Sequence, residues 1–177
     1  MKRKVELKLR ELKRITKEIY GKDIDVTVRY NLNSASVLGY YRHRNLSITL
    51  NEKLLLEFGD RYINEVFVHE FAHAVVRALY PTGWTKNNKR IMPHGKEFKE
   101  VCRNFGIVGR ATTLTFSDSK VLKEKREKNK QNRVELRCSC SSHKVSKTIY
   151  NRVKAGIDYF CTDCGDSLRI PLESKVV

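Results

Sequence analysis

The first apolar pattern in the chain recurs at helical spacing over residues 4–20. Lys and Arg fill much of the rest of this segment, and Gly21 follows it. Such a pattern predicts an amphipathic helix that ends at the glycine. The residues on its apolar stripe are Val5, Leu9, Leu12 and Ile19, with Ile15 at the edge.

Three short segments that follow have the composition of strands. Apolar and polar residues alternate over residues 24–30, and residues 37–41 and 46–50 are also typical of strands. The polar segment 42–45 predicts a turn between the last two. Asn51 is well placed to cap a helix that begins directly after the third strand.

The most apolar helix is predicted over residues 61–79. Its apolar positions cover more than one stripe, which indicates a buried helix, and Pro81 ends it. Three polar residues, His69, Glu70 and His73, interrupt this apolar surface. Burying these polar side chains without an interaction partner costs free energy, and a bound metal ion would be such a partner.

A polar loop over residues 81–93 contains the only tryptophan, Trp84. We predict that a third helix begins near His94 and contains Phe98, Val101 and Cys102. Cys102 is expected to be a core residue rather than a reactive thiol.

The remainder of the chain has a different character. Residues 118–133 are nearly all polar and predict a basic linker or a solvated helix between domains. From residue 134 onward short strands and turns surround cysteines, and basic and apolar residues alternate on two predicted strands over residues 144–154. We therefore predict a first domain over 1–117, the linker over 118–133 and a small zinc-ribbon domain over 134–177.

The spacing His69-Glu70-x-x-His73 has a direct geometric meaning. Residues four apart lie one turn apart on the same helix face, so both imidazoles can bind one metal ion. Glu70 is adjacent and can act as the general base on a water molecule. The pattern predicts a catalytic zinc site, which needs three protein ligands and one open position.

Sequence spacing does not determine the third ligand of this zinc site as it does the first two. His94 is the best candidate, because the residues around it are typical of a turn that enters a helix. His43 competes from a basic turn, and Glu97 and Glu100 are weaker alternatives. Tyr40 and Tyr41 are candidates for positions near the cleft, but no spacing argument places them there.

Four of the five cysteines lie in two close pairs near the C-terminus, which predicts a structural zinc site. Cys161 and Cys164 are three residues apart and precede a glycine, which is the spacing of a zinc knuckle. The other half offers three ligands where two are needed, namely Cys138, Cys140 and His143. An odd number of cysteines argues against a disulfide framework.

The formal net charge is +16, with 36 Lys and Arg against 20 Asp and Glu. An excess of this size indicates attraction to a polyanion, most simply nucleic acid, through salt-sensitive contacts that do not depend on base sequence. The segment over 144–154 suits a phosphate backbone, with Tyr150 available to a base. The sequence contains no apolar run that could span a bilayer and no apolar core of a signal peptide at its start.

The motifs His69-Glu70-x-x-His73 and His94-Gly95-x-x-Phe98 together resemble the SprT-like metalloprotease domain, which is the domain of the Spartan DNA–protein crosslink proteases. Residues 33–36 and 48–51 are similar to the strand segment before the catalytic helix of that family. Residues 109–113 are similar to the short segment after its third-ligand helix.

The C-terminal cysteines resemble the zinc ribbon of bacterial SprT proteins, so the resemblance covers about residues 5–170. By position it implies that His69, His73 and His94 bind zinc and that Glu70 is the catalytic glutamate. In the ribbon it favours Cys138 as a ligand and leaves Cys140 and His143 open. One departure is the basic loop over 81–93 with its own tryptophan.

The resulting hypothesis is a zinc-dependent metalloendopeptidase of the SprT or Spartan type that cleaves proteins bound or crosslinked to DNA. We expect one catalytic and one structural zinc ion, and a monomer that binds single-stranded DNA or DNA without sequence specificity. The expected location is the cytoplasm, with association with the nucleoid as an option, and no association with a membrane is expected. The expected fold is α+β, with a zincin-like domain of helices and a small antiparallel sheet followed by a β-rich zinc ribbon.

Two other functions compete with this hypothesis. The first is a non-catalytic nucleic-acid-binding or transcription-linked factor that uses zinc only for structure. A general base next to two histidines has no purpose in such a protein. The second is a zinc hydrolase that acts on cell-wall amides, which leaves the basic charge and the cysteine module without a role.

Overall fold

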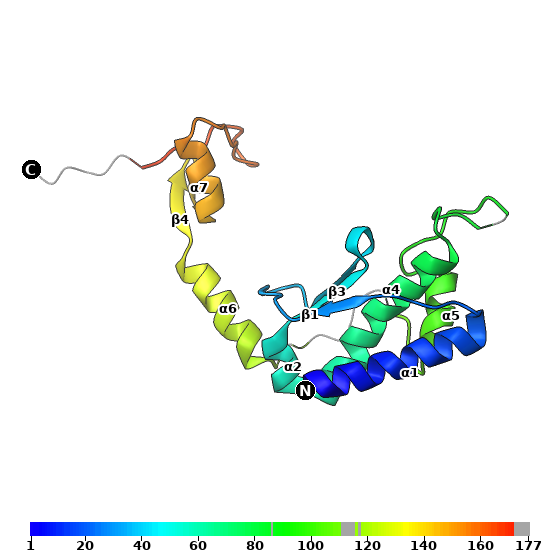
Figure 1. Cartoon of the computed structure of the whole chain (residues 1–177). Coiled ribbons are helices and arrows are strands. Elements are labelled where there is room, and N and C mark those ends of the chain that lie inside the picture. Colours follow the sequence, from blue (N-terminus) through cyan, green and yellow to red (C-terminus); the bar gives the residue numbers. More distant parts are fainter. Residues whose placement is uncertain (86, 111–115, 117, 172–177) are drawn as a thin grey trace, which may run out of the picture. The chain divides into compact units, whose positions relative to one another are not determined.

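The computed structural model describes residues 1–85, 87–110, 116 and 118–171 (Figure 1). The chain forms two compact units, residues 1–123 and residues 124–177. The first unit contains most of the helices and a three-stranded sheet. Its elements are α1 (Lys2–Tyr20), β1 (Thr27–Arg29), β2 (Gly39–Arg42), β3 (Ser47–Leu50), α2 (Glu52–Phe58), α3 (Asp60–Tyr62), α4 (Val68–Leu79) and α5 (Lys96–Asn104).

Helix α1 confirms the predicted N-terminal helix and its end. Gly21 closes the helix with a left-handed backbone at φ 64°, and its N–H donates to the Lys17 carbonyl. Of the apolar stripe, Val5 and Leu12 are fully buried, whereas Ile19 near the end of the helix is half exposed. Thr16 is also fully buried on this helix. Its hydroxyl donates a hydrogen bond to the Leu12 carbonyl at 2.7 Å, so the buried polar group has a partner.

The sheet has the strand order β1-β3-β2, with β3 at the centre. All four residues of β3 are buried, as expected of a strand with neighbours on both sides. Strand β2 runs antiparallel to β3, but β1 runs parallel to it. The prediction of an antiparallel sheet is therefore wrong for β1, since pairing direction depends on the path of the chain and not on the alternation of residues.

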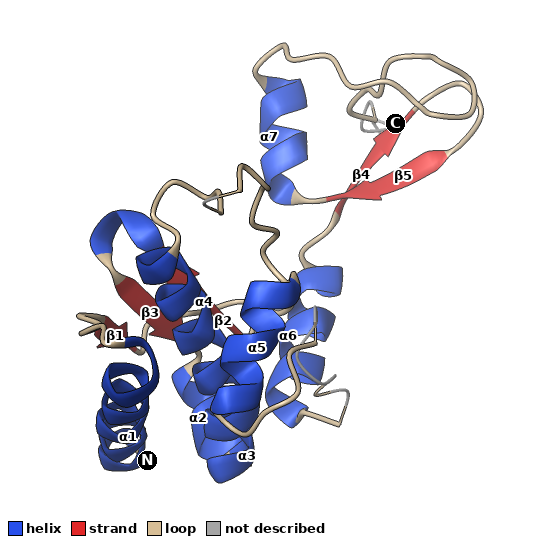
Figure 2. Cartoon of the chain, turned by 90° about the vertical axis from the view of Figure 1, so that its right-hand side faces the viewer, coloured by secondary structure: helices blue, strands red, loops and turns tan. Residues whose placement is uncertain are grey.

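Strand β3 leads into the helical part of the unit. After β3, Asn51 accepts a hydrogen bond from Leu54 N through its side chain, which confirms the predicted cap of α2. The predicted helix over 61–79 is present, but it begins as α3, continues through a π-helical segment (Ile63–Phe67) and then becomes α4. In Figure 2 helices α4 and α5 lie beside each other next to the sheet, and α4 contacts α5, β2 and α1.

Helix α5 confirms the third predicted helix, with Phe98, Val101 and Cys102 on its buried face. Burial raises the pKa of the Cys102 thiol to about 12, in agreement with a core residue. The loop before this helix forms a narrow ribbon in which Trp84 lies opposite Arg90. The hydrogen bond from Ile91 N to Gly83 O closes it.

The polar segment predicted as a linker or solvated helix forms the helix α6 (Lys120–Gln131), which begins in the first unit and ends in the second. Ser119 caps it by accepting from Leu122 N, and Glu57 accepts hydrogen bonds from the Ser119 hydroxyl and from Lys120 N. The start of α6 is therefore fixed to α2 within the first unit.

The second unit is small and contains β4 (Val134–Arg137), β5 (Ser142–Val145) and α7 (Lys147–Lys154). The two strands form an antiparallel hairpin. The predicted strand pair over 144–154 is wrong, because most of this segment is helix α7, which Ser146 caps by accepting from Ile149 N. The unit is thus less β-rich than predicted.

The molecule therefore has a mixed α and β fold, with two small sheets among the described residues. No helix in the described part of the chain is long and apolar enough to cross a membrane.

Candidate metal centre and active site

Three histidines converge between α4 and α5. His69 and His73 lie one turn apart on α4, and His94 lies just before α5. One ring nitrogen from each lies within 4.8 Å of the other two. The ring centroids are 4.9 to 5.2 Å apart. Helix α4 and the segment just before α5 therefore bring three imidazoles close together.

The spacing of these nitrogens fits a metal ion. The Nε2 atoms of His69 and His73 are 3.2 Å apart. Two nitrogens bound tetrahedrally to zinc at the usual bond length would be about 3.4 Å apart. The Nε2 atom of His94 is buried and has no hydrogen-bond partner among the described residues. A buried ring nitrogen without a partner is costly, and a metal ion would satisfy it.

Burial also sets the protonation of the three rings. Together with a smaller contribution from the neighbouring histidines, burial lowers the pKa of His69 to about 4 and that of His73 to about 3. Burial lowers the pKa of His94 as well. The imidazoles are therefore neutral near pH 7, which is the form that binds a metal ion.

Glu70 is buried next to the histidines and is held by the sheet. Its Oε2 accepts a hydrogen bond from the backbone N–H of Tyr41 in β2 at 2.8 Å. Burial, which the Tyr41 N–H offsets only in part, raises the pKa of Glu70 to about 7. A carboxylate that titrates near neutral pH suits a general base.

Tyr41 is the functional residue that the sequence reasoning did not place. Its contribution is a backbone N–H at the outer edge of β2, so no side-chain signal in the sequence could have identified it.

A second set of hydrogen bonds connects the beginning of β2 to the helical stretch that continues into α4. The Tyr62 hydroxyl donates to the Leu38 carbonyl at 2.5 Å and accepts from Asn51 N at 2.8 Å. Tyr62 precedes α4, and Leu38 precedes β2. Close packing adds to this connection, because a Cβ atom on Gly39 would lie 2.8 Å from Val66 Cγ1.

Phe98 forms an apolar wall beside the three histidines. Its ring stacks on His73 with centroids 4.5 Å apart, and it meets His69 and His94 edge-on at 4.9 and 5.0 Å. The side chain is fully buried. Phe98 therefore restricts the orientation of all three rings.

The rival ligands lie outside the histidine group. His43 is in a short 3-10 helix (His43–Asn45) between β2 and β3, and the group contains neither Glu97 nor Glu100. Residues 111–113, which belong to the segment expected after α5, are outside the described residues.

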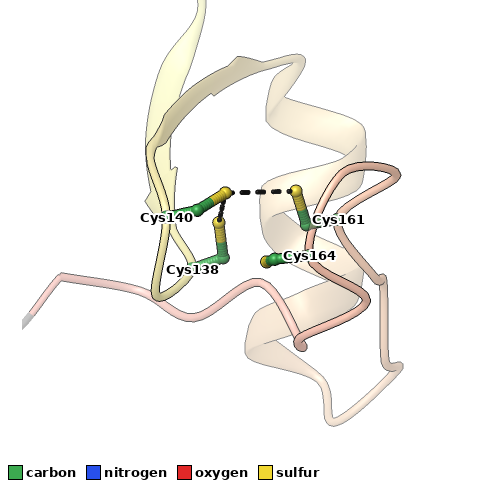
Figure 3. A group of neighbouring side chains, drawn as sticks. All are labelled: Cys138, Cys140, Cys161 and Cys164. Carbon is green, nitrogen blue, oxygen red and sulfur yellow. Dashed lines mark hydrogen bonds between the residues drawn. The ribbon is translucent and has the colours of Figure 1, made fainter.

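The four C-terminal cysteines form a second group, in which all sulfur atoms lie within 4.8 Å of one another (Figure 3). Cys140 Sγ is 3.4 Å from Cys138 Sγ and 3.8 Å from Cys161 Sγ. Two thiolates bound tetrahedrally to zinc would be about 3.8 Å apart. Cys164 completes the set from the knuckle, so the donor set fits zinc with every position filled by protein.

His143 is not part of this sulfur group. Its Nε2 lies 3.2 Å from Cys138 Sγ and 3.1 Å from the Ser141 hydroxyl oxygen. Desolvation opposes ionisation of the Cys138 thiol, but its hydrogen bonds, of which the one with His143 contributes most, together outweigh desolvation and lower the pKa of Cys138 to about 5. The geometry favours Cys138 and Cys140 as the pair, with His143 as a partner of one sulfur.

Comparison with known proteins identifies the family to which this arrangement belongs. Residues 9–120 match the SprT-like family, and this match includes all three histidines and Glu70. The chain belongs to the SprT-like family.

Its similarity to curated SprT-like proteins extends over about two thirds of its length. It is 37% identical over 123 residues to Protein SprT of Klebsiella pneumoniae (strain 342), a match that covers 68% of this chain and 64% of that protein. It is 35% identical over 122 residues to Protein SprT of Escherichia coli (strain K12), with 68% and 64% covered. Protein SprT of Erwinia tasmaniensis is 36% identical over 123 residues, with 69% and 63% covered.

The chain therefore spans less than two thirds of the length of these relatives. No solved structure matches the chain.

Proposed function

We propose that this SprT-like protein is a zinc-dependent metalloendopeptidase. The observation that carries the proposal is the convergence of three neutral imidazoles beside a buried glutamate that a backbone N–H holds in place. Three protein ligands with a carboxylate at their side are typical of a catalytic zinc site and not of a structural one. The edge strand next to the metal helix also supports a zincin-like fold.

Each residue has one role in the proposed reaction. His69, His73 and His94 would hold zinc, which supplies Lewis-acid polarisation of the peptide carbonyl when it is bound. Glu70 takes a proton from the attacking water and passes it to the leaving amine. The Tyr41 N–H keeps one carboxylate oxygen of Glu70 fixed, so the other oxygen is available for proton transfer.

The substitution Glu70→Gln tests this assignment. It keeps the size of the side chain and the three imidazoles, so the variant should bind zinc as the wild type does. Peptide hydrolysis should fall by roughly 10²- to 10⁴-fold, the contribution expected of a general base. Metal content and cleavage of an unfolded protein substrate are the measurements. Glu65→Gln, on the π-helical segment of the same helical stretch, is the matched control. Wild-type activity in the Glu70 variant would contradict the proposed role.

We also propose that the second unit is a structural zinc module. Among its described residues only Leu136 and Cys161 are buried, which is too small a core to fold alone. Zinc bound to four thiolates would contribute the missing folding free energy.

The partner that we propose is DNA, bound without sequence specificity, and the substrates are proteins bound or crosslinked to it. Lys and Arg outnumber Asp and Glu in both units, and α7 presents Lys147, Arg152 and Lys154 with exposed side chains. Cations on one helix favour phosphate contacts.

The test is proteolysis of a DNA-bound protein and of the same protein without DNA, at increasing salt concentrations. Stimulation by DNA that declines steeply with salt is the expected result. Equal cleavage of both forms at every salt concentration would remove DNA from the proposal.

A further inference from the structure

A hollow of about 630 Å³ adjoins the candidate metal centre, because His94 is part of its lining. The rest of the lining comes from α5 and from the chain directly after it. Its volume is within the usual range of sites that take a small ligand or a side chain. The hollow therefore lies beside the place where a polypeptide substrate would have to bind.

Among the described residues, three cations and no carboxylate line this hollow. Lys99 and Arg103 lie one turn apart on α5, and Arg110 comes from the segment after the helix. None of the three forms an ion pair within the described part of the chain, although several other surface cations of this protein do. Like charges repel one another, and an anion in their midst would relieve this repulsion.

Close packing fixes the position of the segment after α5. A Cβ atom on Gly109 would lie 2.8 Å from Lys99 Cα and 3.2 Å from Cys102 Cβ, so the backbone at Gly109 lies directly on the helix. Ile107 N donates to the Cys102 carbonyl at 2.9 Å, and Arg110 N donates to the Val108 carbonyl at 2.8 Å. The backbone that carries Arg110 is thus attached to the helix that carries the other two cations.

We propose that this hollow is a specificity subsite for an acidic side chain of the protein substrate, Asp or Glu, near the bond that is cleaved. The inference rests on the proposed protease function. Polypeptide is favoured over nucleic acid, because phosphate backbones need cations spaced along a groove, whereas these converge on one hollow beside a metal ligand. Ile107 and Val108 add apolar lining, which suits the methylene groups of Glu.

The first experiment profiles cleavage sites with the zinc-loaded full chain and a proteome-derived peptide library. Asp and Glu should be enriched at one position relative to the cleaved bond. The variant K99Q/R103Q should lose this enrichment, and K99E/R103E should replace it with enrichment of Lys and Arg. The control R10Q/R14Q removes the same charge from another exposed helix face and should keep the wild-type profile. An acidic preference that is absent in the wild type or survives in K99Q/R103Q would overturn the proposal.

The second experiment separates failure of the subsite from failure of the proposed function. It measures binding of fluorescent peptides that contain one Glu, or Gln in its place, to the Glu70→Gln variant, so it needs no cleavage. The Glu peptide should bind about tenfold more tightly, as expected for one charge-assisted hydrogen bond, and K99Q/R103Q should abolish the difference. Such a difference without any cleavage by the wild type would keep the subsite and reject the protease.

Two results of the binding experiment would reject the subsite. The first is equal binding of the Glu and Gln peptides to the Glu70→Gln variant. The second is a K99Q/R103Q change that weakens binding of a single-stranded oligonucleotide and leaves the peptide difference unchanged, since the hollow would then bind phosphate.

Discussion

At the scale of single residues, the candidate metal centre depends on burial as much as on residue type. His69 and His73 are predictable from their spacing, because residues four apart must share a helix face. Their pKa values, about 4 and 3, follow from burial among apolar side chains such as Phe98. The structure also separates His94, which joins the group, from His43, which does not.

Substitution of His94 tests the third ligand directly. His94→Ala leaves two imidazoles, which hold zinc much less tightly than three, so we expect the metal content to fall from about two ions per chain to about one. His43→Ala removes a histidine of the 3-10 turn and should leave both ions bound. Elemental analysis after dialysis is the measurement. Loss of zinc from the His43 variant, with retention in the His94 variant, would reverse the assignment.

At the scale of elements, the site is a junction between a helix and the edge of a sheet. The Tyr41 N–H of strand β2 donates a hydrogen bond to Glu70, and the Tyr62 hydroxyl donates one to the carbonyl of Leu38, directly before this strand. A π-helical segment lies immediately before α4, and such segments are frequent at functional sites. None of these features has a sequence pattern of its own, since backbone groups and helix windings are set by packing.

Substitution of Tyr62 measures how much this junction contributes to the free energy of unfolding. Tyr62→Phe leaves the Leu38 carbonyl and Asn51 N–H without their partner in a buried region, so the free energy of unfolding should fall by about 1–3 kcal/mol. The hydroxyl of Tyr80 makes no hydrogen bond in the described part of the chain, and Tyr80→Phe is therefore the matched control. Urea unfolding of the zinc-loaded chain is the measurement. Equal stability of the two variants would show that the Tyr62 hydroxyl contributes nothing.

At the scale of the whole molecule, the chain divides into two units with different sources of stability. The first has a core of large apolar side chains, including Phe67, Phe71 and Phe98. The second has few buried side chains and four converging sulfurs. Loss of metal should therefore affect the two units unequally.

Substitution of one cysteine tests this difference. Cys161→Ser removes one of four thiolate ligands, so residues 134–171 should lose protection against amide hydrogen exchange because zinc binding is coupled to their folding. Residues 1–110 should keep their protection. Cys102→Ser, in the core of the first unit, is the contrasting variant and should leave the exchange of 134–171 unchanged. Exchange measured by mass spectrometry resolves the two units. Full protection of 134–171 in the Cys161 variant would show that this unit folds without the complete metal site.

The sequence by itself determined the main helices of the first unit, the residues that could bind metal and the basic character of the chain. These follow from local periodicity, from ligand spacing and from composition, which need no knowledge of distant contacts. Only the tertiary structure decided that β1 runs parallel to β3, that residues 147–154 are helical, and that His94 meets His69 and His73. It also brought the Tyr41 N–H to Glu70, 29 residues away in sequence, and folded the segment after α5 back onto that helix beside His94, because the path of the chain and not a local pattern sets such contacts.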